Sequence, residues 1–360
     1  MRFSLSADQV AFRDAVRELL ADQCGPSVVR AAWSEAADTA AYPSTDRSAH
    51  PLADPLAAAA GAVDAVWQHL AELGLFAAAA PEDQGGLGLV ETDLVPVLEE
   101  VGYAAVPWPV AETMAVAVPL LVATGDPADL LADMVAGKTK VALAGSAGGI
   151  HNGLVPYGRR AELILSLAGG QARLTASGAT TRESTVDGSL AAVRIGTLND
   201  DVLTDDPELV ELSVDRADLA TAAQLVGLGR RMLDLTTAYV ATRRQFGAPV
   251  GSFQAVKHHL ANALLRLEFA APAVLAAGWA LAGRGATRRR DVSMAAILAS
   301  EAARETAKAA IQCHGAIGYT VEYDLHLYAK RAWALAATCR TDEHLERLAD
   351  ALDLPEREAI

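Results

Sequence analysis

The sequence predicts a mostly helical protein with a small central β domain. Hydrophobic residues make up 52% of the 360 residues but aromatic residues only 5%, and much of the hydrophobic content is alanine, a strong helix former. Apolar residues recur every three or four positions towards both ends of the chain, which indicates amphipathic helices. Between Lys140 and Leu198 this spacing gives way to short apolar runs separated by Gly-Gly and polar clusters, which is typical of short strands. We therefore expect a helical domain at 1–123, a reduced β domain at 124–206 and a bundle of four helices at 207–360.

The N-terminal third carries recognisable helix signals. Ser6 and Gln9 have the spacing of a capping box, and the apolar residues that follow stay on one helical face as far as Gly25. From about 31 to 63 the chain is rich in alanine, serine, aspartate and proline, which indicates a long loop with weak helix. Helices are expected again at 66–75, at 94–101 and in the apolar stretch that ends near 123. The glycine-rich turn at 81–88 lacks the residues of a phosphate loop or of a dinucleotide fingerprint.

The C-terminal part predicts four antiparallel helices, at roughly 215–246, 252–283, 291–314 and 322–350. Arg243, Arg244 and Gln245 would occupy the last turn of the first of these helices. Gly247 and Pro249 would end that helix, and Ser252 would cap the next. A basic helix C-terminus is also favoured by the helix dipole alone. From the residues themselves, these side chains are therefore either solvated at a helix end or positioned to bind a polar ligand.

The charge balance and the cysteines exclude several functional classes. The formal charge of −15 argues against nucleic acid or an anionic membrane as the main partner, but it permits a local basic pocket for a phosphate-bearing cofactor. The three cysteines show no paired spacing, which suits the reducing cytoplasm. The longest charge-free apolar run, at 269–283, is too short to cross a bilayer. The histidines lack neighbours typical of a metal site, so no metal is expected. We expect a cytoplasmic protein.

Three segments resemble acyl-CoA dehydrogenases, in the family's order. Residues 243–254 resemble the family's R-x-x-F-G-x-P-I-G-x-F-Q segment, and residues 312–323 its Q-x-x-G-G-x-G-(Y/F)-x-x-E segment. The run LAELGLF…PEDQGGLG…VLEEVGYA is similar in order and spacing to the family's N-terminal helical domain. The resemblance implies the acyl-CoA dehydrogenase fold, with an N-terminal helical domain, a β domain and a C-terminal four-helix bundle.

The resemblance also implies FAD shared across a subunit interface. In the family, the two C-terminal motifs of one subunit hold the pyrophosphate and adenine end of the FAD seated in its neighbour. A guanidinium pairs with phosphate oxygens in a fixed geometry, and small residues let the backbone approach the cofactor. The positions that match the family's cofactor-binding residues are Arg243, Gln245, Phe246, Gln312, Gly315 and Ala316.

The departures from the family pattern concern catalysis. The segment 141–149 lacks the threonine, glutamate-proline and aspartate that contact the flavin ring and the thioester in the family. The family's usual catalytic glutamate falls on Arg340, and an arginine cannot abstract an α-proton near neutral pH. An alternative base position falls on Ala217. Asp215 and Asp218 lie beside it and are weak candidates, since aspartates at a helix start commonly serve as caps. We therefore expect no catalytic residue in this chain.

This pattern resembles the subunit without its own base in heterotetrameric α2β2 acyl-CoA dehydrogenases of actinobacterial sterol side-chain degradation. It implies a second, homologous subunit that carries the flavin ring site and the base, and an acyl-CoA substrate such as a steroid side-chain thioester that undergoes α,β-desaturation. Two alternatives stay open. One is a homo-oligomeric acyl-CoA dehydrogenase with a non-standard base, and the other is a flavin-free structural partner.

Overall fold

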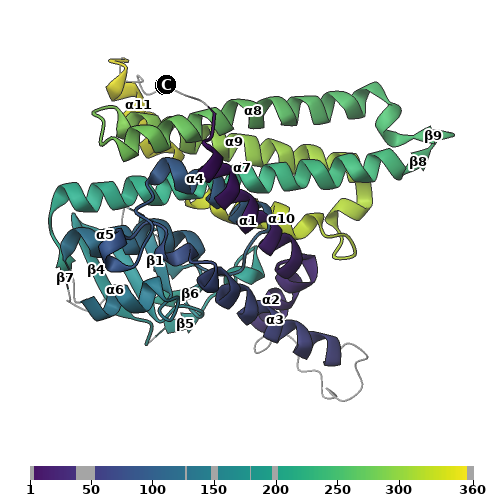
Figure 1. Cartoon of the computed structure of the whole chain (residues 1–360). Coiled ribbons are helices and arrows are strands. Elements are labelled where there is room, and N and C mark those ends of the chain that lie inside the picture. Colours follow the sequence, from purple (N-terminus) through teal and green to yellow (C-terminus); the bar gives the residue numbers. More distant parts are fainter. Residues whose placement is uncertain are drawn as a thin grey trace.

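The computed structural model describes residues 4–37, 53–125, 128–146, 153–178, 180–196 and 202–354. Helices dominate both ends of the chain, and two small sheets lie between them (Figure 1). This confirms the predicted fold class. The division into domains at 123/124 and 206/207 stays a prediction, although the order of the elements follows it.

The N-terminal part consists of helices, the longest of which meet in one apolar core. The Ser6–Gln9 capping box is confirmed: the Ser6 hydroxyl accepts from the Gln9 amide at 3.1 Å, and the Gln9 side chain accepts from the Ser6 amide at 2.7 Å. The elements of this part are α1 (Ala7–Gln23), α2 (Pro26–Ala37), α3 (Ala53–Glu72), α4 (Glu91–Tyr103), the π-helical η4 (Glu112–Ala117), α5 (Val118–Thr124) and α6 (Ala128–Val135), with 3-10 turns η2 (Leu75–Ala77) and η3 (Glu82–Gln84).

The prediction of a long loop at 31–63 is wrong for the residues of this segment that the structure describes. α2 continues to Ala37 and α3 begins at Ala53, and Val63, Val66 and Trp67 are buried within α3. The alanines of this segment favour helix strongly, and Pro55 lies in the first turn of α3, where proline does not interrupt a helix. The remainder, at 38–52, lies outside the described residues.

The central part contains two sheets packed face to face. Residues alternate along β1 (Val141–Ser146): Val141 belongs to a core shared with α5 and α6, whereas Ala142 and Ala144 face the second sheet. The first sheet has the order β1, β3 (Leu163–Ala168), β4 (Gln171–Ala176), β7 (Val202–Thr204), with β1 and β3 parallel. The second has the order β2 (Leu154–Val155), β6 (Val193–Ile195), β5 (Thr180–Arg182), and the short turn η5 (Gly188–Leu190) lies beside it. The strands predicted in this region are confirmed.

The C-terminal part is built on three long helices that run side by side (Figure 1). The first predicted helix begins earlier than expected, at Pro207, because Asp206 caps it, and it ends at Thr242 rather than 246. The fourth predicted helix is two helices separated by a bend at Cys339 and Arg340. The elements are α7 (Pro207–Thr242), the hairpin β8 (Arg244–Gln245) and β9 (Ala248–Pro249), the turn η6 (Val250–Ser252), α8 (Gln254–Ala282), α9 (Arg288–His314), the turn η7 (Gly315–Tyr319), α10 (Leu325–Thr338) and α11 (Thr341–Ala351).

Two glycines let α4 lie directly against α7. A Cβ on Gly227 would come within 1.9 Å of the Glu99 carbonyl oxygen, and a Cβ on Gly102 would come within 2.2 Å of the Gln224 carbonyl oxygen. Any side chain at either position would therefore force the two helices apart. This contact fixes the N-terminal helices against the bundle.

Within the described residues, α8 is the one helix that is long and apolar enough to cross a membrane by length and composition, with 29 residues and a mean hydropathy of 1.4 over its most apolar window. Half of that window is buried inside the protein, as in the core helix of a soluble fold. The helix α8 is longer than the charge-free run of 15 residues at 269–283, because the isolated charged residues before that run do not end the helix.

Candidate functional site

The first motif forms a β-hairpin at one end of the bundle (Figure 1). Phe246 and Gly247 both have left-handed φ angles, of 52° and 79°, as in the two-residue turns that join antiparallel strands. The helical assignment of 243–246 is therefore wrong, since a left-handed residue cannot continue a right-handed helix. Ser252 does not cap α8 either: its hydroxyl donates to the Pro249 carbonyl at 2.7 Å, and Phe253 is the capping residue.

The hairpin presents its side chains to the outside. Arg243, Gln245 and Phe246 are all exposed, and Phe246 is 95% exposed. Arg244 donates to the Gly247 carbonyl at 3.0 Å and so folds back onto the turn. Among the described residues, the side chains of Arg243 and Gln245 make no hydrogen bond or ion pair, which leaves the Arg243 guanidinium available to an external anion.

The second motif follows the end of α9. Gly315 has a left-handed φ of 65° and ends the helix, and Gln312, Gly315 and Ala316 are exposed. A Cβ on Gly315 would meet no atom within 4 Å, so the backbone there is open to an approaching molecule. An open, small-residue backbone and an exposed guanidinium are both groups that suit the diphosphate end of a nucleotide cofactor.

The two motifs meet through a stack of aromatic rings. The His314 ring lies on the ring of Tyr239, one turn before Arg243, with centroids 4.3 Å apart, and 4.7 Å from the ring of Tyr323. The Nδ1 atom of His314 is 2.8 Å from the Ala310 carbonyl, which can only accept, so Nδ1 carries the proton. Burial lowers the pKa of His314, which keeps the ring neutral. The structure thus joins the helix ends that precede the first motif and carry the second, and the contact of the predicted residues with FAD stays a prediction.

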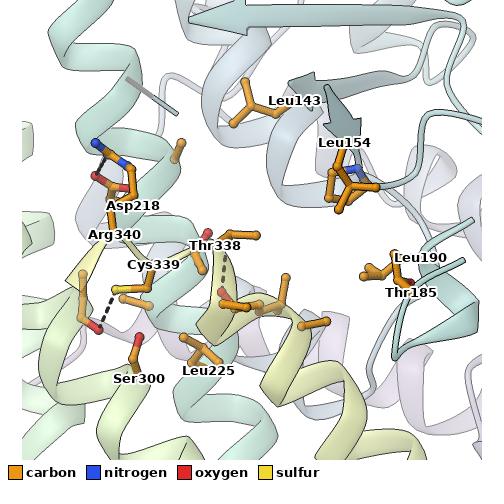
Figure 2. A pocket seen from close by; sticks show the side chains of 18 of the residues that line it. Leu143, Leu154, Thr185, Leu190, Asp218, Leu225, Ser300, Thr338, Cys339 and Arg340 are labelled. Carbon is orange, nitrogen blue, oxygen red and sulfur yellow. Dashed lines mark hydrogen bonds and ion pairs between the residues drawn. The ribbon is translucent and has the colours of Figure 1, made fainter. Parts of the chain in front are cut away.

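A cavity of about 470 Å³ lies between the sheets and the bundle. Figure 2 shows Asp218 and Arg340 at one side of it, Thr185 and Leu190 at the other, and Leu143 and Leu154 reaching in from strands β1 and β2. Most of the wall is apolar. The residues that matter for chemistry are Glu112, Asp218, Ser300, Arg340 and His344.

Arg340 lies in the bend between α10 and α11 and lines this cavity. Its Nη2 atom donates to Asp218 Oδ2 at 3.1 Å, and its Nη1 atom pairs with Glu343. Burial raises the pKa of Asp218 to about 6, against the opposing effect of the Arg340 charge. At neutral pH the pair is therefore ionised. His344 lies 3.7 Å from the same carboxylate, and burial lowers its pKa to about 4, so it stays neutral.

The two aspartates considered as bases are both held in ion pairs. Asp215 Oδ2 accepts from Arg288 Nε at 3.2 Å, and Asp218 is bound by Arg340. The explanation of these residues as helix caps is wrong, because Asp206 caps α7 and both lie well inside the helix. Ala217, between them, presents a methyl group to the cavity. The assignment of Asp215 or Asp218 as a catalytic base stays an untested prediction.

Glu112 is a cavity residue that the sequence analysis missed. It begins the π-helical η4, and π-helical turns are frequent at functional sites. Burial raises its pKa to about 7. The nearby Arg331 is already bound by Asp187, by Ser189 and by the Val106 carbonyl at 2.9 Å. The signal in the sequence was a single acidic residue within an apolar stretch, at 110–121.

Comparison with known proteins settles the family. Residues 36–137 match the model of the acyl-CoA dehydrogenase N-terminal domain, and residues 210–345 match that of the acyl-CoA dehydrogenase C-terminal domain. The chain is 31% identical over 321 residues to the acyl-CoA dehydrogenase IpdE2 of Mycobacterium tuberculosis, a match that covers 89% of each protein. The chain belongs to the acyl-CoA dehydrogenase family.

Solved structures agree with this assignment at the level of the fold. The ChsE4–ChsE5 complex from Mycobacterium tuberculosis matches with a TM-score of 0.78 and 22% identity over 100% of both chains. The Tcur3481–Tcur3483 steroid ACAD G363A variant also gives a TM-score of 0.78, with 23% identity over 96% of this chain and 98% of that one. The predicted acyl-CoA dehydrogenase fold is thereby confirmed. Membership places this acyl-CoA dehydrogenase among FAD-dependent oxidoreductases that act on CH–CH bonds.

Proposed function

We propose that this chain is the subunit without its own base in a heteromeric acyl-CoA dehydrogenase. One observation carries the proposal: Arg340, which the resemblance aligns with the catalytic glutamate, occupies the cavity wall in the bend between α10 and α11, and its partners Asp218 and Glu343 neutralise it. A guanidinium bound to two carboxylates cannot accept the α-proton of an acyl thioester. The base would come from a homologous partner subunit.

In this arrangement the chain binds the pyrophosphate and adenine end of the FAD that is seated in the partner. Arg243 would pair with the pyrophosphate, Gln245 and Gln312 would offer amide groups, and Phe246 would present an aromatic face. The open backbone at Gly315 and Ala316 would let the cofactor approach closely. FAD, when bound, accepts the hydride from the substrate's β-carbon while the partner's base takes the α-proton, which leaves the α,β-unsaturated thioester. The residues of this chain would fix the position of the cofactor and stay outside the proton transfer.

An apolar stripe on α8 supports the presence of a partner. Leu265, Phe269 and Trp279 lie within a narrow sector of the helix surface and are 56%, 68% and 57% exposed. Clustered exposed apolar side chains mark protein–protein contact sites. The similarity to ChsE4–ChsE5 and to a steroid acyl-CoA dehydrogenase favours a homologous partner and a steroid side-chain CoA thioester. The free cysteines Cys24, Cys313 and Cys339 favour the cytoplasm.

Co-expression tests the proposal. The chain would be produced alone and together with a homologous acyl-CoA dehydrogenase chain that retains the catalytic glutamate, and the flavin absorbance and dehydrogenase activity of each preparation would be measured. We expect a colourless, inactive lone chain and a yellow, active complex. Arg243→Ala should remove most of the flavin from the complex, whereas the control Arg244→Ala, whose guanidinium folds back onto the hairpin, should retain it.

The alternatives predict different results. A lone chain that binds one equivalent of FAD and oxidises acyl-CoA would favour a homo-oligomeric enzyme with a non-standard base and contradict the proposal. A complex that keeps its flavin and activity after Arg243→Ala would favour a flavin-free structural role for this chain. Complex formation without any change in flavin content would also support that structural role.

A further inference from the structure

The contact between Trp33 of α2 and His326 of α10 encloses nitrogen atoms that lack hydrogen-bond partners. His326 is 6% exposed, and neither of its ring nitrogens has a partner in the described part of the chain. The Trp33 Nε1 atom is likewise enclosed and unpartnered. The two rings stand at 87° to each other, with centroids 5.4 Å apart. A buried N–H group without an acceptor is costly, so its retention here indicates an acceptor that the polypeptide does not supply.

Lys330 adds a positive charge to the same contact. It follows His326 by one turn of α10, so both side chains lie on one face of that helix. Its Nζ atom stands 4.6 Å from the centroid of the Trp33 ring. Among the described residues, Lys330 has no ion pair and no hydrogen bond. Trp33, His326 and Lys330 are called the α2–α10 cluster below.

The carboxylates near the α2–α10 cluster are held by other cations. Asp324 pairs with Arg30, and Asp187 pairs with Arg331. Both carboxylates are close enough to act on the His326 ring through their charge, but neither bonds to it. The lysine of the cluster therefore lacks a counter-charge of its own within the described residues.

Hydrogen-bond roles favour an anion over a water molecule as the missing acceptor. Trp33 Nε1 and Lys330 Nζ can only donate, and the His326 ring donates from one nitrogen when neutral and from both when protonated. A water molecule would need acceptors for its own two protons, and in the cluster only an unprotonated His326 nitrogen offers one. An anion accepts from every donor and also neutralises the lysine. Because the ring nitrogens are enclosed by protein, the space beside them suits only a small ion.

We propose that the α2–α10 cluster binds a small monovalent anion of the size of chloride. Trp33 would donate from Nε1, His326 from a ring nitrogen, and Lys330 would supply the opposite charge. The indole is held in place from the side of η5, since a Cβ on Gly188 would lie 3.3 Å from its ring. The bound ion would tie α2 to the first turns of α10. None of the three residues lines the cavity or belongs to the predicted FAD contacts, so this site does not depend on the proposed function.

Bromide is the probe, because it is close to chloride in size and scatters X-rays anomalously. Crystals of the full-length chain soaked in sodium bromide should show an anomalous peak between Trp33 Nε1 and Lys330 Nζ. In solution, thermal unfolding would be followed while bromide replaces gluconate at constant ionic strength. At about a tenfold excess over the dissociation constant, wild type should gain about 2 °C in unfolding midpoint relative to Lys330→Met. General effects of the salt cancel in this difference.

Two further variants make the test specific. Trp33→Phe keeps an aromatic ring and removes the N–H donor, so it should lose most of the bromide-dependent gain. Lys308→Met is the matched control, because Lys308 is an exposed lysine of another helix, α9, and this variant should respond as wild type does.

Three outcomes would overturn the proposal. These are the absence of an anomalous peak at the cluster in wild type, an equal bromide-dependent gain in wild type and Lys330→Met, and a gain from acetate as large as that from bromide. The last result would show that the site is open to larger anions. Flavin content and dehydrogenase activity of the complex do not enter these measurements, so this test can fail while the proposed function stands.

Discussion

The imidazole of His314 lies nearly parallel to the phenol ring of Tyr239, with an interplanar angle of 18° and ring centroids 4.3 Å apart. Tyr239 belongs to the last turn of α7 and His314 ends α9, so the stack joins the helix ends that carry the two family motifs. The position of Gln312 and Gly315 relative to Arg243 therefore depends on a contact between Tyr239, which precedes the first motif, and His314, an unspecified position of the second motif.

Removing this stack should weaken cofactor retention without touching the cofactor contacts themselves. His314→Ala should lower the affinity of the complex for FAD by about fivefold, corresponding to the roughly 1 kcal/mol of one aromatic pair. His314→Phe keeps a flat ring and should retain most of the affinity. Fluorescence titration of the flavin-stripped complex measures both variants, and equal affinity of His314→Ala and wild type would contradict the positioning role.

Arg340 should be required for stability. Arg340→Ala leaves the buried carboxylate of Asp218 without its main counter-charge, and we expect a loss of about 3 kcal/mol in the free energy of unfolding. The double variant Arg340→Ala with Asp218→Ala should recover part of this loss, because no uncompensated charge is left. Denaturant titration at neutral pH measures the three variants, and additive losses would show that the ion pair contributes no coupling.

Glu112 should make the stability of the fold depend on pH. Its pKa is about 7 in the folded protein and has an ordinary value of 4.5, so the folded state binds the proton more tightly. The free energy of unfolding should therefore fall as pH rises from about 4.5 to about 7, and the loss should be complete above this range. Glu112→Gln cannot ionise. The stability of this variant relative to wild type should increase by about 2–3 kcal/mol across the same interval.

The contact between α4 and α7 should tolerate no side chain at Gly227. Gly227→Ala places a methyl group within 1.9 Å of the Glu99 carbonyl and should destabilise the protein by at least about 3 kcal/mol. Gly61→Ala is the matched control, because Gly61 is a helical glycine with nothing within 4 Å of the added Cβ. It should stabilise the protein by about 0.5–1 kcal/mol through helix propensity. Thermal unfolding of the pair decides whether the close approach, rather than glycine itself, matters.

The sequence predicts best what is encoded locally. The Ser6–Gln9 box and the apolar period of the bundle helices depend on residues within a few positions of each other, and both are found in the structure. The hairpin at Phe246 is missed because its turn lacks the usual Asn-Gly or Asp-Gly signal and follows a strong helical pattern. The structure places Arg340 in the wall of the cavity, and its alignment with the family's catalytic glutamate stays a prediction.

The chemistry of the cavity depends on contacts between distant residues. Asp218 and Arg340 are 122 positions apart, and nothing near either residue indicates their ion pair. Glu112 is one acidic residue in an apolar stretch, and its raised pKa arises from elements that fold around it. Side-chain environments of this kind are fixed by tertiary packing, which periodicity and propensity do not encode.

The bend between α10 and α11 would not accept a catalytic glutamate by a single substitution. A glutamate introduced in place of Arg340 would stand beside Asp218 and Glu343, and three neighbouring carboxyl groups would repel one another. Regaining a proton acceptor there requires at least one of these neighbours to change as well. If the proposed function holds, charge repulsion at this bend would keep a chain with this arginine and its acidic partners dependent on another polypeptide for its base.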